Sequence, residues 1–149
     1  MEIDVATYKK ILVAVDLSPE ARAVLARACE LRAHYGAVIC LIHVVEPIVL
    51  GGDYELVPVM PVEIEETLLQ RAKDYLGKLA GEMNITDAQQ VVEVGSVKHE
   101  ILHFAEERGF DLIVIGAHGR HGVATLLGST ANAVLHGSKC DVLCVRLGE

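Results

Sequence analysis

Aromatic residues are scarce in this sequence: they make up 4% of its 149 positions, although 52% of the residues are hydrophobic. The core must therefore consist mainly of Val, Leu, Ile and Ala. This composition is typical of a parallel sheet whose strands are buried on both faces by helices. The high apolar content argues against intrinsic disorder. The length suits a single domain covering residues 1–149.

Basic residues are also few, with 13 Lys and Arg against 21 Asp and Glu, so that the net charge is −8. The sequence contains no run of Lys or Arg. An acidic protein without such a run repels phosphate backbones and anionic membranes. Nucleic acid is therefore not an expected partner. The charge does not exclude a nucleotide, because backbone amides can form a phosphate site.

Long apolar runs are absent. The longest, Ala37–Val45, contains His43 and is much shorter than the roughly 20 residues that span a bilayer. Met1–Lys10 carries two acidic residues and lacks the apolar segment of a signal peptide. We therefore expect a cytoplasmic protein without membrane insertion.

Cysteines are few, and none of them forms a C-x-x-C pair that would indicate a redox or zinc site. We interpret the four cysteines as buried small hydrophobic residues: Cys29, Cys40, Cys140 and Cys144.

Five short apolar runs rich in β-branched residues predict buried strands. They are Ile11–Val15, Val38–Val45, Val91–Val94, Leu112–Ile115 and Asp141–Leu147.

Helical patterns separate these strands. The first follows Ser18, a predicted capping residue, and ends at Gly36; the others are Val62–Met83, His99–Arg108 before Gly109, and a helix from Ser129, a second predicted cap, to about His136. Residues at helical spacing predict the inner face of the second helix: Ile64, Leu68, Leu69, Ala72, Leu76 and Leu79. Glu46–Pro61 is predicted to be one long loop.

Strands that alternate with helices predict an α/β fold with an open parallel sheet and helices on both faces. Among the common strand orders, 3-2-1-4-5 places the first and fourth strands side by side. Their connections then leave in opposite directions and open a crevice at the carboxyl ends of the strands. We expect the functional site there.

Two segments meet at this crevice. Asp16 follows the first strand, and a glycine-containing segment follows the fourth. Glycines allow backbone amides to approach an anion, and hydroxyl groups at a helix N-terminus favour phosphate. The predicted phosphate-binding residues are Gly116, Gly119, Gly128, Ser129 and Thr130. No P-loop or G-x-G-x-x-G motif is present.

These motifs resemble the universal stress protein family along essentially the whole chain. The resemblance lies in Lys10–Ser18, Leu41–Val44, Asp111–Gly116 and the Gly116-x-x-Gly119…Gly128-Ser129 pattern. It implies a Rossmann-like fold related to adenine nucleotide alpha hydrolases, a role in the stress response, and ATP bound with Mg²⁺. It also implies that Asp16 and Val44 contact the base or ribose, and that the glycine-rich segment holds the phosphates.

The sequence departs from the family pattern in one respect. The ATP-binding pattern has nine residues between its second and third glycines, whereas eight separate Gly119 from Gly128 here. One residue fewer shortens the loop by up to about 3.5 Å.

The resemblance also implies a homodimer that forms through the last strand, here Val142–Leu147. This strand is an apolar sheet edge, and such an edge must be covered by another part of the protein or by a partner.

Three hypotheses therefore stand: a dimeric nucleotide-binding regulatory module, a nucleotide-free dimeric scaffold, and a slow ATP hydrolase or transferase that uses His118 or His121. The sequence shows no assembled set of nucleophile, base and orienting residue.

Three other histidines are not expected to be catalytic or metal-binding. His43 is interpreted as a structural histidine. His99 and His103 are interpreted as solvated helix surface.

Overall fold

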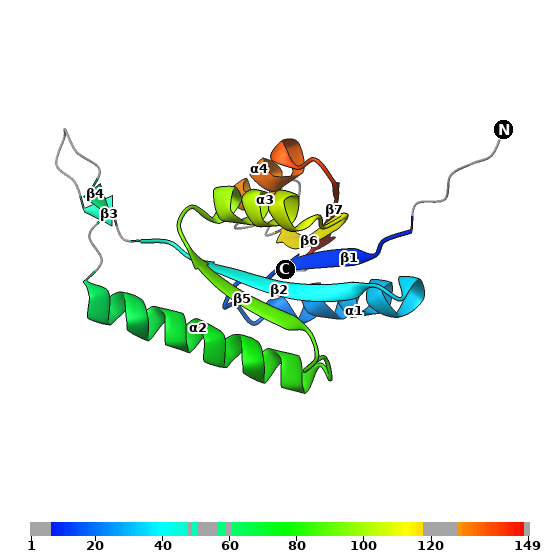
Figure 1. Cartoon of the computed structure of the whole chain (residues 1–149), viewed down its shortest axis with the longest axis horizontal. Helices are drawn as coiled ribbons and strands as arrows, with labels where there is room; N and C mark the ends of the chain where they lie inside the picture. The colour runs from blue at the N-terminus through cyan, green and yellow to red at the C-terminus, as the bar shows by residue number, and fades with distance from the viewer. Residues whose placement is uncertain (1–6, 48, 51–56, 59–60, 118–127, 148–149) are drawn as a thin grey trace.

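The computed structural model describes residues 7–47, 49–50, 57–58, 61–117 and 128–147. Over these ranges strands alternate with helices, except that two short strands lie between the second long strand and the second helix (Figure 1). In chain order, the elements are β1 (Lys10–Ala14), α1 (Ala21–Tyr35), β2 (Val38–Val45), β3 (Val49–Leu50), β4 (Val57–Pro58), α2 (Val62–Glu82), β5 (Gln89–Val94), α3 (Val97–Arg108), β6 (Leu112–Ala117), α4 (Ser129–Gly137) and β7 (Asp141–Arg146).

The five longer strands form one sheet in the order β5-β2-β1-β6-β7, with every neighbouring pair parallel. Because β5, β6 and β7 are the third, fourth and fifth predicted strands, this confirms the predicted order 3-2-1-4-5. β1 is central and lies beside β6, with Val13 opposite Val114. The switch point therefore lies between these two strands, as expected.

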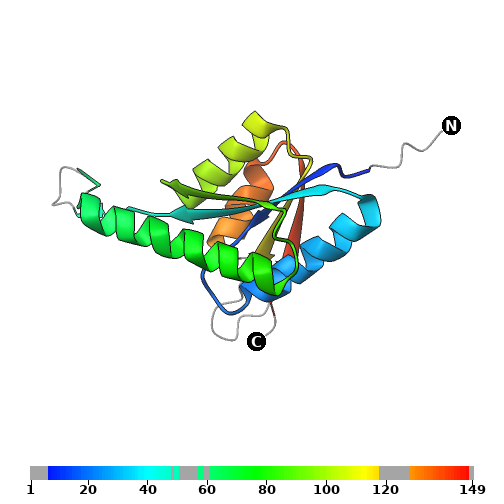
Figure 2. The same cartoon turned by 60° about the horizontal axis from the view of Figure 1, so that its bottom comes forward.

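Helices cover both faces of the sheet. In Figure 1, α3 and α4 lie above it and α1 and α2 below it, and the turned view in Figure 2 shows the same layers. One core cluster joins Val13 to Leu25 of α1 and Leu76 of α2. The other joins Leu12 to Phe104 of α3. Adjacent residues of β1 thus serve opposite layers, which explains its uninterrupted apolar sequence.

The helix ends follow the sequence signals only in part. Gly36 and Gly109 end α1 and α3 in the left-handed region, with φ of 65° and 70°, which glycine adopts at little cost. The prediction that Ser18 and Ser129 cap these helices is wrong. The N-cap residues are Glu20 for α1 and Gly128 for α4, and neither makes a side-chain capping bond. The hydroxyl of Ser18 instead donates to Asp16.

Within the segment predicted to be one loop, β3 and β4 form a short antiparallel pair. The α2 helix that follows has 21 residues and is about 31 Å long, whereas a strand of six residues such as β5 spans about 20 Å. Its first turns therefore project past the sheet (Figure 2). Ile64, predicted to face inward, is 47% exposed for this reason.

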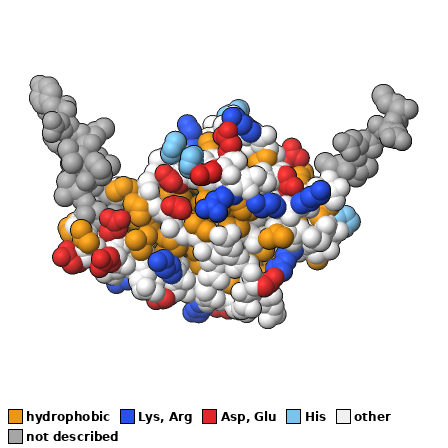
Figure 3. Space-filling view, in the orientation of Figure 1, with side chains coloured by type: hydrophobic (Ala, Val, Ile, Leu, Met, Phe, Trp, Pro, Cys, Tyr) orange, Lys and Arg blue, Asp and Glu red, His pale blue; other side chains and the backbone are white. Residues whose placement is uncertain are grey.

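The surface carries charges of both signs. In Figure 3 acidic and basic side chains are interspersed over most of the visible face, and acidic ones gather at the N-terminal end of α2. Glu63 and Glu65 lie in that first turn, where they favour the helix dipole. Within the described ranges, no helix is both long and apolar enough to cross a membrane.

All four cysteines are free thiols. Only Cys40 is fully buried, and burial raises the pKa of its thiol to about 11. The other three are partly buried, so the prediction of buried small residues is confirmed for Cys40 alone.

Candidate functional site

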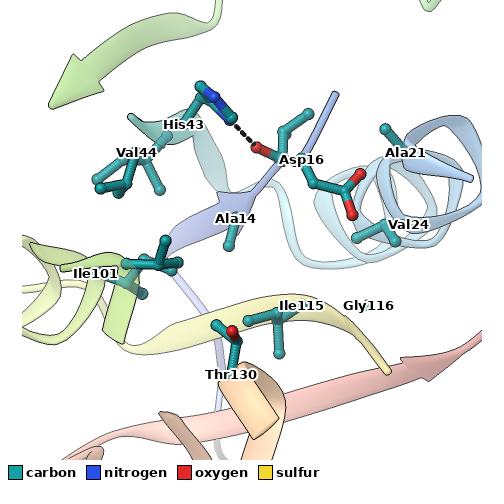
Figure 4. Close-up of a pocket in the computed structure, with 13 residues that line it drawn as sticks. Ala14, Asp16, Ala21, Val24, His43, Val44, Ile101, Ile115, Gly116 and Thr130 are labelled. Atoms are coloured by element: carbon teal, nitrogen blue, oxygen red, sulfur yellow. Dashed lines mark hydrogen bonds between the residues drawn. The ribbon is translucent and has the colours of Figure 1, made fainter. Parts of the chain in front are cut away.

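A cavity of about 190 Å³ opens at the carboxyl ends of the central strands. Its walls come from the ends of β1, β2 and β6 and from the first turns of α1, α3 and α4. Figure 4 shows these segments around the cavity. The cavity therefore lies at the crevice that the strand order predicts.

Four of the predicted site residues line this one cavity: Asp16, Val44, Gly116 and Thr130. They come from four segments, namely the turn after β1, strand β2, strand β6 and the start of α4. Their side chains and backbone surround the same space in Figure 4. The topology alone brings these residues together, because they lie far apart in the sequence.

The remaining predicted residues lie beside the cavity or outside the described ranges. Gly128 precedes the first turn of α4, where its carbonyl accepts a hydrogen bond from the amide of Asn132 at 2.9 Å. Ser129 is exposed and Thr130 is partly buried. The N-terminus of α4 thus opens beside the cavity. Gly119, like His118 and His121, lies outside the described residues.

The turn after β1 is held by a compact set of hydrogen bonds. Oδ1 of Asp16 accepts hydrogen bonds from the amide of Ser18 at 3.0 Å and from its hydroxyl at 2.5 Å. The carbonyl of Ser18 accepts one from the hydroxyl of Tyr75, on α2, at 3.1 Å. Burial raises the pKa of Tyr75. The exposed carboxylate of Asp16 is therefore fixed at the cavity mouth.

His43 also lines the cavity. Its Nδ1 donates a hydrogen bond to the carbonyl of Val15 at 2.7 Å (Figure 4). The prediction that the His43 ring has a hydrogen-bond partner is confirmed. Its place in the wall was missed, because the sequence does not show which backbone carbonyl the ring meets.

Much of the wall is apolar. Val97 and Ile101 from α3 line the cavity opposite Ile115 of β6. Val97 was missed, because the predicted helix began at His99 and the real one begins at Val97. Ile101 lies within the predicted helix, but its spacing indicates an inward-facing residue and not that it borders the cavity. The spacing of four residues between the two was the available signal. The wall suits a flat, weakly polar ring.

Gly116 is surrounded more closely than its predicted role requires. A Cβ there would lie 2.8 Å from Cδ1 of Leu147 and 2.9 Å from Cγ2 of Val24. Real Cβ atoms are not found so close to other carbon atoms. The structure therefore gives Gly116 a packing role between α1 and the segment after β7.

Metal ligands are not clustered in the described part of the chain, where no group of three or more His, Cys, Asp or Glu side chains could hold an ion. His99 and His103 stack on the exposed face of α3 with ring centroids 5.9 Å apart. Nε2 of His103 lies 3.0 Å from Glu107. These features confirm that the pair is solvated helix surface.

The chain matches the model of the universal stress protein family over residues 7–146. It is 47% identical over 142 residues to universal stress protein A homolog 2 of Coxiella burnetii, covering 94% of this chain and 96% of that protein. Universal stress protein A homolog 1 of the same organism is 41% identical over 144 residues, with coverage of 95% and 99%.

Solved structures agree with these sequence relatives. The protein MJ0577 superimposes with a TM-score of 0.76 at 26% identity and coverage of 97% and 99%. A universal stress protein solved in complex with cAMP superimposes with a TM-score of 0.63 at 25% identity and coverage of 94% and 98%. On the family match and the close relatives together, this chain is a member of the universal stress protein family.

Proposed function

We propose that this protein binds ATP or another adenine nucleotide in the cavity and acts in the cytoplasm as a dimeric regulatory module of a stress response. The observation that carries the proposal is the convergence of Asp16, Val44, Gly116 and Thr130 on one cavity at the switch point. The complex of a family member with cAMP supports the choice of an adenine nucleotide.

The cavity suits the base. Its volume of about 190 Å³ is below the roughly 300–1,000 Å³ of pockets that enclose a whole ligand. Apolar side chains of Val97, Ile101 and Ile115 line it and would pack against a flat ring. The base would therefore lie inside, with the ribose and phosphates at the mouth.

Polar groups at the mouth suit the rest of the nucleotide. The Asp16 carboxylate would accept hydrogen bonds from ribose hydroxyls. The phosphates would lie at the N-terminus of α4, near Gly128, Ser129 and Thr130, where amides and the helix dipole favour anions. Gly119 would complete this phosphate site. Mg²⁺ would be held mainly by phosphate oxygens and water, neutralising charge, since the described residues offer no carboxylate cluster.

Val97→Trp tests the position of the base site. The indole at this partly buried position in the wall would fill the cavity. Calorimetric titration with Mg-ATP should therefore show at least a roughly tenfold loss of affinity. This loss is equivalent to about 1.4 kcal/mol of binding free energy. The control is Lys98→Trp, at the exposed neighbouring position, which should bind as the wild type does. Equal affinity in both variants would place the base elsewhere.

The nucleotide itself is tested on the wild type. Mass spectrometry of small molecules released from freshly purified protein should find an adenine nucleotide. If none is released and Mg-ATP produces no calorimetric heat, the nucleotide-free scaffold is the correct hypothesis. Single-turnover hydrolysis that is lost in His118→Ala or His121→Ala would instead establish the enzyme.

Dimerisation through Val142–Leu147 is part of the same proposal. β7 is an edge strand of the described sheet. The amide of Leu147 donates to the carbonyl of Ala117 on β6. Because backbone groups alternate in direction along a strand, the amides of Val142 and Cys144 point away from β6. These amides are available to pair with a second copy of the chain.

A further inference from the structure

The pairing of β1 with β2 stops in an unusual way beside the cavity. Their register runs to Ala14 opposite Ile42, and the amide of Val15 then donates to the carbonyl of Ile42 at 2.8 Å. In a regular parallel ladder the next bond would join the amide of Val44 to the carbonyl of Val15. That carbonyl instead accepts the 2.7 Å hydrogen bond from Nδ1 of His43.

The imidazole thus takes the place of a backbone donor. A carbonyl oxygen can only accept, so Nδ1 of His43 must carry the proton in this contact. The donor is present in both the neutral and the charged ring. Figure 4 shows the ring of His43 reaching across to the backbone of β1, at the level where the chain turns toward Asp16.

The His43 contact leaves the Val44 amide without the Val15 carbonyl as its acceptor. Since the Ile42 carbonyl faces β1, the peptide groups of Val44, two residues later, face the same side. β1 has ended at that level, and the cavity lies there, because both Val44 and Asp16 line it. The backbone edge of Val44 is therefore directed at the cavity.

We propose that His43 is a positioning residue of the nucleotide site: by holding the Val15 carbonyl it opens the β1–β2 ladder and leaves the backbone edge of Val44 to recognise the base. The same contact fixes the peptide before Asp16 and so helps to place its carboxylate. This inference rests on the proposed function, and it adds the residue that makes the base-binding edge accessible.

Two substitutions separate the hydrogen bond from the bulk of the ring. The side-chain amide of His43→Asn offers an N–H donor close to the position of Nδ1, whereas His43→Leu has similar size and no donor. In titrations with Mg-ATP, His43→Asn should stay within about threefold of the wild type, and His43→Leu should bind roughly tenfold more weakly. Equal affinity in wild type and His43→Leu, or equal loss in both variants, would overturn the proposal.

Amide exchange at Val44 gives a readout that needs no nucleotide. In nucleotide-free protein, NMR should show slower exchange of the Val44 amide in His43→Leu than in the wild type, because the released Val15 carbonyl becomes its acceptor. His43→Asn should exchange as the wild type does. Unchanged exchange in His43→Leu would show that the ring does not keep the ladder open.

Failure of this inference can be told apart from failure of the proposed function. A wild type that binds no adenine nucleotide refutes the proposed function, while the Val44 exchange rates still test whether His43 opens the ladder.

If His43→Leu does not fold, His43→Gln replaces it, because the glutamine amide lies one carbon further out and misses the Val15 carbonyl. His43→Gln should then show the weaker binding, and wild-type affinity would count against the proposal.

Discussion

Gly116 shows how a residue of the cavity wall can also be required for packing. It lines the cavity, and its missing side chain also leaves room for Leu147 and Val24. The sequence predicts an anion-binding glycine here, with turn formation as the alternative, because glycines that precede a helix N-terminus are typical of such sites. The contact with Leu147 depends on the path of the chain after β7, which the local sequence does not reveal.

Gly116→Ala should therefore lower stability. Its new methyl group would force the buried Val24 and the side chain of Leu147 to move, which typically costs about 1–3 kcal/mol in a packed interior. Urea unfolding measures the change in the free energy of unfolding.

The matched control for this substitution is Gly77→Ala in α2. A Cβ at Gly77 would meet only Oε1 of Gln90, at 3.7 Å, and Ala is favoured over Gly inside a helix by about 0.5–1 kcal/mol. Gly77→Ala should therefore be neutral or stabilising. Equal stability in the two variants would mean that the contacts around Gly116 relax freely.

At the scale of elements, the start of β1 is anchored to the half of the sheet that holds β6 and β7. The Asp111 carboxylate, before β6, accepts hydrogen bonds from the amides of Lys9 at 2.8 Å and Lys10 at 3.1 Å. The hydroxyl of Tyr8 donates to Asp141 at the start of β7 at 2.7 Å. These contacts fix the amino end of the central strand to its neighbours on one side of the sheet.

The bond between Tyr8 and Asp141 should make stability depend on alkaline pH. Hydrogen bonding to Asp141, followed by burial, raises the pKa of Tyr8 from 10.0 to about 12. The folded protein therefore holds the phenol proton more tightly than the unfolded chain does. The stabilising contribution is complete below pH 10 and declines as the pH rises toward 12.

The measurement is the difference in the free energy of unfolding between the wild type and Tyr8→Phe, obtained by urea titration at several pH values. This difference should shrink between pH 10 and 12, because Phe cannot ionise and other alkaline effects are common to both proteins. A constant difference across that range would contradict the assigned hydrogen bond.

At the scale of the whole molecule, the sheet has two edges, β5 and β7, and only one of them is the proposed dimer interface. α2 packs beside β5, whereas β7 directs alternate amides away from β6. A Pro at one of these outward positions removes a donor that β6 does not use, and edge strands tolerate such a Pro.

If the proposed dimer forms through β7, Cys144→Pro should convert it into a folded monomer. Sedimentation velocity measures the oligomeric state, and circular dichroism tests folding. Cys144→Ala is the control, because it also loses the thiol but keeps the amide, and it should remain dimeric. A monomeric wild type, or a Cys144→Pro protein that is still dimeric, would refute pairing through β7.

The order of the sheet could be predicted because it follows from apolar runs and right-handed crossovers. The convergence of Asp16 and Thr130 followed from that order. Less could be predicted where side chains act on distant backbone. Ser18 is typical of a helix cap, yet its hydroxyl serves Asp16, and nothing near His43 in the sequence identifies Val15 as its acceptor.

The projection of α2 was missed for a different reason. Helical spacing predicts which face of a helix is apolar but not whether a sheet lies opposite every turn. Ile64 continues the apolar face of α2 past the point where the strands end. Val97 was missed because a boundary error of two residues left it outside the predicted helix. Ile101 was inside that helix, but helical spacing does not show which cavity an inward-facing residue borders.

The central position of β1 has a consequence for how the chain is synthesised. β2 emerges from the ribosome soon after β1, but the other neighbour of β1, β6, ends at Ala117. At about 5–20 residues per second, the interval between them lasts several seconds. During that time the nascent protein exposes the apolar edge of its middle strand, so early intermediates should be recognised by chaperones until Leu112–Ala117 is translated.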